Sequence, residues 1–171
     1  MRYFNGFSLH GEEEFFREYL IQSDLCIAGF SYGAQKAFEY VYNATQRVDR
    51  LILLSPAFFQ NQKPSFIRTQ LRYFQSGQEA YSKQFLANVA YPSQVDLLSH
   101  LNVGTLEALE SLLTYRWDSE KIKEVIARGT TIEVFLGSED KILDAMAAFE
   151  FFSENTVTYW IKGAGHLLKI E

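Results

Sequence analysis

The chain has 171 residues, of which 47% are hydrophobic and 22% are charged, with a formal net charge of -5. This length and composition predict one soluble globular domain, and no segment approaches the roughly 18 consecutive apolar residues of a membrane-spanning helix. The negative charge argues against nucleic-acid binding, which needs a basic face. The N-terminus has no apolar signal core, so we expect a cytoplasmic protein.

The single cysteine, Cys26, excludes an intrachain disulfide and lies in an apolar run, which is typical of a small buried side chain.

Short β-type runs alternate with helical patterns along the chain, which is typical of a parallel sheet with crossover helices. Most of these runs are continuously apolar, as expected for strands covered on both faces. Five strands are predicted, over residues 2–4, 25–28, 51–54, 132–136 and 156–161. Apolar side chains at helical spacing predict crossover helices over residues 12–21, 34–42 and 144–152. The fold class is therefore α/β, with about five mainly parallel strands flanked by helices.

The segment 60–129 is far longer than a crossover between the third and fourth strands requires. Its many aromatic residues and patterned leucines favour several helices over an irregular loop. We expect a single domain over residues 1–171, with 60–129 forming an inserted helical cap. The apolar side chains of this cap either pack it onto the body or line a channel for an apolar acyl chain, and both interpretations remain open.

A Gly-x-Ser-x-Gly pattern at residues 29–33 follows the second predicted strand and precedes a predicted helix. This context is typical of a nucleophile elbow, in which the glycines relieve crowding around a serine held in a strained turn. The pattern predicts Ser31 as a catalytic nucleophile. The alternative is that Ser31 only caps the N-terminus of the helix.

A nucleophilic serine needs an imidazole base and an acid that orients this base, in the chain order serine, acid, histidine for this arrangement. His166 follows the last strand in a glycine-rich turn, whereas His10 precedes the elbow and His100 lies in the inserted segment. We therefore predict His166 as the base, and His10 and His100 as surface or satisfied polar residues. The alternative for His166 is a surface histidine.

The acid is expected just after the fourth strand, where Glu139 and Asp140 stand next to each other. We predict Asp140, because Glu139 would point the other way if the loop is extended. Asp140 could instead be an ordinary loop carboxylate or cap the helix that begins near Asp144. No metal site and no organic cofactor are predicted.

Acyl transfer also needs two N–H donors for the developing oxyanion. The backbone N–H of Tyr32, the residue after the nucleophile, is the first candidate. The second is the N–H of Phe7, in the loop after the first strand, where Gly6 permits a turn. The alternative is that this loop is only a strand-ending turn.

The order of these motifs resembles the α/β-hydrolase superfamily, in which a strand followed by Asn/His-Gly-aromatic precedes G-x-S-x-G, G-x-x-D and G-x-G-H. Ser31 comes earlier than is usual, which predicts that the opening β-hairpin of the superfamily is absent. Only one helix fits between Phe7 and Leu25, so we also expect the strand that normally precedes the nucleophile strand to be missing. The chain ends five residues after His166, so we expect no long final helix. The sequences GFSYGAQKA and RYFNGF are similar to those of the short biotin-pathway esterase family called BioV.

The resemblance to this family implies a cytoplasmic carboxylesterase that hydrolyses the methyl ester of pimeloyl-acyl carrier protein. It also implies a partner, an acyl carrier protein whose phosphopantetheine carries the pimeloyl methyl ester. Between residues 60 and 99 four basic side chains, Lys63, Arg68, Arg72 and Lys83, outnumber two acidic ones. Such a basic surface would favour docking of an acidic carrier, and Arg68 and Arg72 share a face on a helix. The alternative is that these residues are only solvated helix faces.

The sequence is compatible with three functions. The first is the carrier-protein methyl esterase, and the second is a general acyl esterase or thioesterase that uses the same residues. The third is a ligand-binding protein with a hydrolase fold and no catalysis. The residues alone indicate a serine hydrolase.

Overall fold

One parallel sheet organises the computed structural model, which describes all residues 1–171. Its strands are β1 (Arg2–Phe4), β2 (Cys26–Phe30), β3 (Arg50–Leu54), β4 (Thr131–Gly137) and β5 (Val157–Ile161). They lie side by side in chain order, and each pair of neighbours is parallel. The five predicted strands are confirmed, with bounds that shift by no more than two residues.

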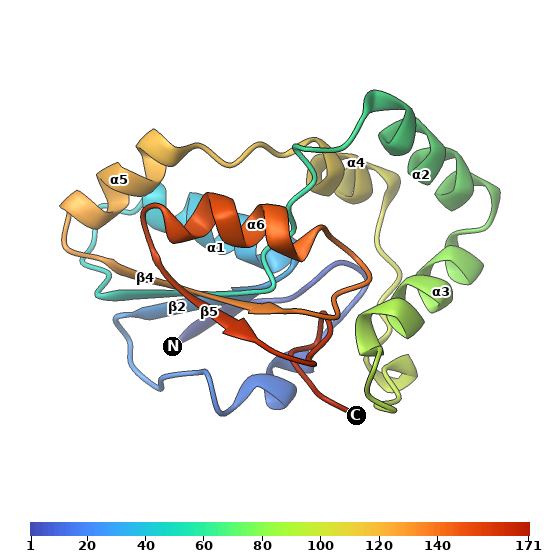
Figure 1. The fold of residues 1–171 in the computed structure, drawn as a ribbon, viewed down its shortest axis with the longest axis horizontal. Helices are drawn as coiled ribbons and strands as arrows, with labels where there is room; N and C mark the ends of the chain where they lie inside the picture. The colour runs from blue at the N-terminus through green and yellow to red at the C-terminus, as the bar shows by residue number, and fades with distance from the viewer.

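Three helices cover one face of the sheet, α1 (Tyr32–Tyr42), α5 (Ser119–Ala127) and α6 (Ala145–Ser153) (Figure 1). The buried side chains Phe38 of α1, Val125 of α5 and Phe152 of α6 join Leu53 and Val134 of the strands in one hydrophobic core. Two of these helices, α1 and α6, were predicted from the apolar spacing. Burial of this continuous apolar layer is the main stabilising contribution on this side of the sheet.

The opposite face has a thinner cover, made by the segment between β1 and β2, the end of α3 (Gln78–Ala90) and the last residues of the chain (Figure 1). Phe16, Phe30, Leu86 and Leu167 meet there in a second buried cluster. The residues that follow β5 therefore pack back under the sheet, and this brings His166 to its carboxyl edge.

The helix predicted over residues 12–21 is wrong in type and length. Only a short 3₁₀ helix, η1 (Glu12–Phe16), forms, and Gly11 precedes it in the left-handed region with φ 67°. The apolar spacing instead reflects two separate contacts with the sheet. The ring of Phe16 lies 4.8 Å from that of Phe30, and the ring of Tyr19 lies 4.9 Å from that of Phe135.

Helices α2 (Pro64–Ser76), α3 and α4 (Leu106–Thr114) gather at one end of the sheet (Figure 1). A short 3₁₀ helix, η2 (Leu98–His100), lies between α3 and α4. Helix α5 also falls within residues 60–129, but its Ile122 and Val125 are buried on the sheet with Phe38. The division of the chain into a body and a cap over 60–129 stays a prediction. None of the helices combines the length and hydropathy needed to cross a bilayer.

Candidate active site

Ser31 occupies the single residue between β2 and α1, in a strained backbone conformation with φ 55° and ψ -113°. Its N–H donates to the carbonyl of Leu54, and its own carbonyl accepts from the N–H groups of Ala34 and Ala57. A non-glycine residue at positive φ persists only where its surroundings hold it. The elbow is thus fixed by β3 on one side and by the first turn of α1 on the other.

The two glycines of the pattern are required by close backbone packing. A Cβ on Gly29 would collide with the carbonyl of Gly33, and a Cβ on Gly33 would collide with the carbonyl of Phe4. Both positions therefore exclude any side chain. The second contact also brings the loop after β1 directly against the first turn of α1, beside Ser31.

The structure brings Ser31, His166 and Asp140 together in one hydrogen-bonded chain. Nε2 of His166 lies 2.9 Å from Oγ of Ser31, and Nδ1 lies 2.6 Å from Oδ2 of Asp140. When Nδ1 carries the proton, His166 donates to Asp140 and accepts from the Ser31 hydroxyl. This is the arrangement in which an imidazole can take the serine proton and an aspartate fixes its tautomer.

The remaining oxygen of Asp140 is held by its own loop. Oδ1 accepts from the N–H of Ile142 at 2.7 Å and from that of Leu143 at 3.1 Å. Glu139 is exposed, and its carboxylate accepts a hydrogen bond from Ser138. The choice of Asp140 over Glu139 therefore agrees with the geometry, and the two backbone donors lock the carboxylate in place.

Further residues, which the sequence reasoning missed, hold the loop of His166. The hydroxyl of Ser55 donates to the carbonyl of His166 at 2.6 Å, and the N–H of Leu167 donates to the carbonyl of Val89 in α3. A Cβ on Gly137 would collide with the carbonyls of Ala164 and Gly165, so the loops after β4 and β5 pack backbone to backbone. Ser55 directly follows β3, as Ser31 directly follows β2. This position at a strand end is the only signal in the sequence that could have indicated a role for Ser55.

The three side chains are enclosed by protein. Ser31 is 1% exposed, and the side chains of Asp140 and His166 are both 0% exposed. Hydrogen bonds in such a low-dielectric environment are stronger than in water. The enclosure also excludes solvent from the hydroxyl that would attack a substrate.

The two predicted oxyanion donors lie in segments that meet beside Ser31. Tyr32 is the first residue of α1, where the N–H has no partner within the helix. Phe7 is 2% exposed, and its N–H donates to no acceptor in the protein. Buried backbone N–H groups are rarely left unpaired. Neither N–H thus has an acceptor within the protein, and their role in binding a substrate oxygen stays a prediction.

The loop that contains Phe7 is held by Glu12, which the sequence reasoning did not single out. Oε1 of Glu12 accepts from the N–H of Gly6 at 2.7 Å and from the hydroxyl of Tyr3 at 3.3 Å. The side chain is buried, and Oε2 has no partner. Burial raises the pKa of Glu12, and the hydrogen bond from Gly6 opposes this shift.

The other two histidines lie apart from this site. Nδ1 of His100 lies 3.0 Å from the carbonyl oxygen of His10, which accepts, and Nε2 lies 3.2 Å from the carboxylate of Glu14. His10 is exposed. Nowhere do three His, Cys, Asp or Glu side chains gather in a way that could hold a metal ion.

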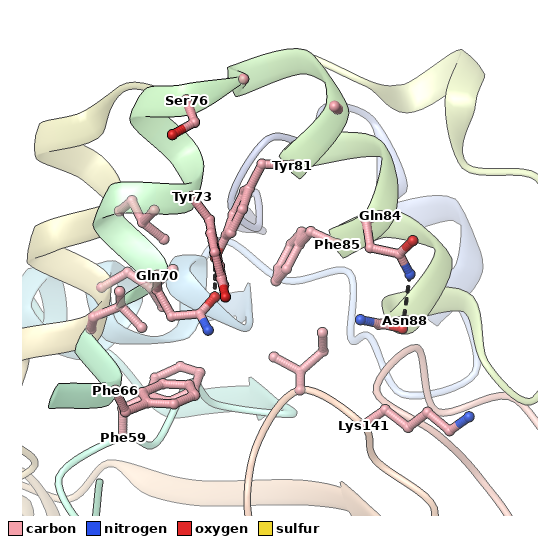
Figure 2. A pocket seen from close by; sticks show the side chains of 16 residues that line it. Phe59, Phe66, Gln70, Tyr73, Ser76, Tyr81, Gln84, Phe85, Asn88 and Lys141 are labelled. Atoms are coloured by element: carbon pink, nitrogen blue, oxygen red, sulfur yellow. Dashed lines mark hydrogen bonds between the residues drawn. The ribbon is translucent and has the colours of Figure 1, made fainter. Parts of the chain in front are cut away.

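A cavity of about 590 Å³ opens between α2, α3, α4 and the loop after β4 (Figure 2). Its wall is mainly apolar, and includes Phe59, Phe66, Phe85, Leu109 and Ile142. In this wall the hydroxyl of Tyr81 donates to Oε1 of Gln70 at 2.8 Å, and Lys141 lies at the edge of the cavity (Figure 2).

Two of the wall residues connect the cavity to the candidate catalytic residues. Ile142 provides the N–H that holds Asp140, and the ring of Phe85 lies 5.7 Å from that of Phe7. Ser31 itself is not part of the wall. A ligand in the cavity would therefore lie next to the site, with Ser31 covered in this conformation.

The four basic residues predicted to dock a carrier all lie on α2, on α3 or at their start, and all are exposed. Arg68 and Arg72 are one helical turn apart on α2, and neither forms an ion pair. Lys83 pairs with Glu79 at 2.9 Å on α3, and Lys63 precedes α2. Their role in docking stays a prediction.

No protein-family model and no curated protein match the sequence. Solved structures share its fold. Carboxylesterase CesB from Bacillus subtilis aligns with a TM-score of 0.56 and 19% identity over 85% of this chain and 54% of its own. MenH from S. aureus gives a TM-score of 0.60 and 15% identity over 96% and 85% of the two chains. An alpha/beta hydrolase fold protein from Burkholderia ambifaria gives 0.56 and 17% identity over 83% and 59%.

These similarities establish that the chain has a reduced α/β-hydrolase fold, with five parallel strands. The chain spans a little over half the length of the carboxylesterase, and most of MenH.

Proposed function

We propose that the chain is a serine carboxylesterase that hydrolyses the methyl ester of pimeloyl-acyl carrier protein. The main support for an esterase is the continuous chain of hydrogen bonds from Ser31, which lies on a strained elbow, through His166 to Asp140. Solved structures with the same fold include carboxylesterases. The finer substrate assignment rests on the sequence resemblance to the short biotin-pathway esterases.

The mechanism follows from the geometry. His166, oriented by Asp140, takes the proton of the Ser31 hydroxyl as Oγ attacks the ester carbonyl, and the N–H groups of Tyr32 and Phe7 stabilise the oxyanion. The tetrahedral intermediate then expels methanol, which receives the proton from His166. Water attacks the acyl-enzyme by the same general-base route, so that the free carboxylate leaves and Ser31 regains its proton.

Two features support an acyl substrate attached to a carrier. The apolar cavity beside the site could hold an acyl chain. The unpaired Arg68 and Arg72 lie on the outer face of α2, whose Phe66 and Gln70 line the same cavity. A carrier that docks at these arginines would be next to the cavity, and its negative charge would speed association at low salt.

The test measures methanol release from pimeloyl-acyl carrier protein methyl ester and from a free methyl ester of equal chain length, for the wild type and Ser31→Ala. We expect Ser31-dependent release that is much faster from the carrier-bound ester. Equal turnover of both esters would indicate a general esterase. No turnover, together with no labelling of Ser31 by a fluorophosphonate, would contradict the esterase function.

The double substitution Arg68→Glu/Arg72→Glu tests carrier docking separately. We expect it to lower turnover of the carrier-bound ester and to leave the free ester unaffected. The matched control is Arg17→Glu/Lys123→Glu, which changes the net charge equally at exposed positions outside α2 and α3. An equal loss in both double variants would contradict a docking role.

A further inference from the structure

Glu12 is the only one of three consecutive glutamates that the fold buries. Its residue is 0% exposed, whereas Glu13 and Glu14 are exposed. A buried carboxylate is unfavourable unless its oxygens are hydrogen-bonded. Yet Oε2 of Glu12 has no partner, and the side chain makes its shortest contact through Oε1 with the backbone N–H of Gly6. The carboxylate is therefore held by this contact and by the longer one, of 3.3 Å, from the hydroxyl of Tyr3.

The hydrogen bond to Gly6 fixes one of two peptide planes that meet at this residue. Glycine has wide conformational freedom, so an anchor on its N–H restricts a segment that would otherwise be adjustable. The next peptide plane is fixed as well, because the carbonyl of Gly6 accepts from the N–H of Leu9 at 3.3 Å. One plane beside Gly6 is thus held by Glu12, and the other by a turn within the loop itself, from Gly6 to Leu9.

The second of these planes carries the N–H of Phe7. In a trans peptide the C=O and the N–H point in opposite directions. With the Gly6 carbonyl directed toward Leu9, the Phe7 N–H points to the other side, where it meets no acceptor in the protein. The packing of Gly33 against the carbonyl of Phe4 places this loop beside the elbow of Ser31. The direction of the Phe7 N–H hence depends on the turn from Gly6 to Leu9, and Glu12 anchors the peptide plane that immediately precedes this turn.

We propose that Glu12 is a positioning residue for ester hydrolysis, whose carboxylate holds the Gly6 N–H so that the Phe7 N–H is directed at the oxyanion. The inference rests on the proposed esterase function, and it does not depend on the carrier-bound substrate. Glu12 itself touches no reacting atom. Its effect is on the transition state, where charge develops on the substrate oxygen, and not on binding of the neutral ester.

The test uses Glu12→Asp and Glu12→Gln with a soluble p-nitrophenyl ester. Aspartate is shorter by one methylene group, so its carboxylate would lie about 1.5 Å farther from the N–H of Gly6. Glutamine has the length of glutamate and keeps an oxygen acceptor at the same position. We expect Glu12→Asp to lower kcat about 10- to 100-fold with little change in KM, since removal of a whole oxyanion donor costs about 100- to 1,000-fold. We expect Glu12→Gln to retain most of the activity. Glu13→Asp and Glu13→Gln are the matched controls at an exposed position.

A second readout separates positioning from a general structural role. A trifluoromethyl ketone forms a hemiketal with the nucleophilic serine and places an oxyanion at the donors, so its affinity should fall with kcat across the variants. Binding of the product acid should stay constant. A folded Glu12→Asp with wild-type kcat, or a loss of kcat that the ketone affinity does not follow, would overturn the proposal. A Glu12→Gln variant that is folded and as inactive as Ser31→Ala would also overturn it. If Glu12→Asp does not fold, Glu12→Gln alone provides the test.

The wild-type measurements keep the two hypotheses apart. A wild type that neither hydrolyses the ester nor reacts with a fluorophosphonate would contradict the esterase function itself. An active wild type together with a folded Glu12→Asp of wild-type kcat would contradict only the positioning role.

Discussion

The hydroxyl of Ser55 donates a hydrogen bond of 2.6 Å to the backbone carbonyl of His166, across 111 residues of sequence. Ser55 is the residue after β3, as Ser31 is the residue after β2, and both have positive φ. The two serines thus stand at adjacent strand ends. One faces the imidazole of His166, and the other holds its backbone.

We predict that Ser55→Ala destabilises the fold by about 1–3 kcal/mol, because it leaves a buried carbonyl without its donor. It should also lower kcat by about 10-fold or more, since the imidazole loses its backbone support. Urea unfolding and ester hydrolysis would measure the two effects. The control is Ser153→Ala, which removes an exposed hydroxyl that donates within α6, away from the cavity. A Ser55→Ala that behaves like this control would contradict the role assigned to Ser55.

The neighbouring acids Glu139 and Asp140 give a direct test of the site. We predict that Asp140→Asn lowers kcat by about 10⁴-fold, because an amide favours the wrong tautomer of His166. Glu139→Gln should leave hydrolysis unchanged, because Glu139 is exposed and makes no contact with His166. Hydrolysis of a p-nitrophenyl ester, with circular dichroism to check the fold, measures both. A loss of kcat in Glu139→Gln, with none in Asp140→Asn, would indicate that Glu139 orients His166 instead of Asp140.

The strands and the three hydrogen-bonded residues could be predicted because each depends on a local pattern. A buried parallel strand is a short apolar run, and the elbow needs glycines at fixed distances from Ser31. Elimination among three histidines then left His166, whose contact with Ser31 at 2.9 Å agrees with this choice. These patterns can be recognised in the sequence without knowledge of the tertiary contacts.

The helix over residues 12–21 and the role of Glu12 could not be predicted, for a related reason. Apolar side chains at helical spacing also arise when a non-helical segment contacts a sheet at two points, as Phe16 and Tyr19 do. An acidic residue at the start of such a segment is normally solvated. Only the fold shows that Glu12 turns inward to the N–H of Gly6.

Gly33 is where the elbow and the loop of Phe7 pack backbone to backbone. We predict that Gly33→Ala destabilises the protein by at least about 2 kcal/mol and abolishes fluorophosphonate labelling, since the new methyl group would push the loop away. Gly77→Ala is the matched control, because a Cβ there has its nearest neighbour, Ala80, at 3.8 Å. Thermal unfolding and labelling measure the outcome. Equal behaviour of the two variants would contradict the packing argument.

The raised pKa of Glu12 predicts a dependence of stability on pH. Burial makes ionisation of this carboxyl harder in the folded state than in the unfolded state. The free energy of unfolding of the wild type should therefore fall, relative to that of Glu12→Gln, as the pH rises from the range where an ordinary glutamate ionises up to the folded-state pKa. Above that pH the difference should be constant. Urea unfolding of both proteins at a series of pH values measures it, and a difference that does not change with pH would contradict a raised pKa.

The cavity between α2, α3 and α4 predicts a selection by acyl-chain length. Ala80 lines the cavity from α3, and Ala87 lies on the same helix outside the lining, both exposed. Because a tryptophan at position 80 would occupy space that an acyl chain needs, we expect Ala80→Trp to lower kcat/KM for an octanoyl ester, relative to an acetyl ester, by about 10-fold or more.

Ala87→Trp should keep the wild-type ratio between the two esters, which distinguishes a filled cavity from a general effect of a large residue on α3. The same pair of variants, measured with the carrier-bound methyl ester, extends the test to the proposed substrate. If Ala80→Trp and Ala87→Trp keep the same preference for chain length, the acyl chain does not lie in this cavity. The apolar wall would then serve only to pack α2, α3 and α4 together.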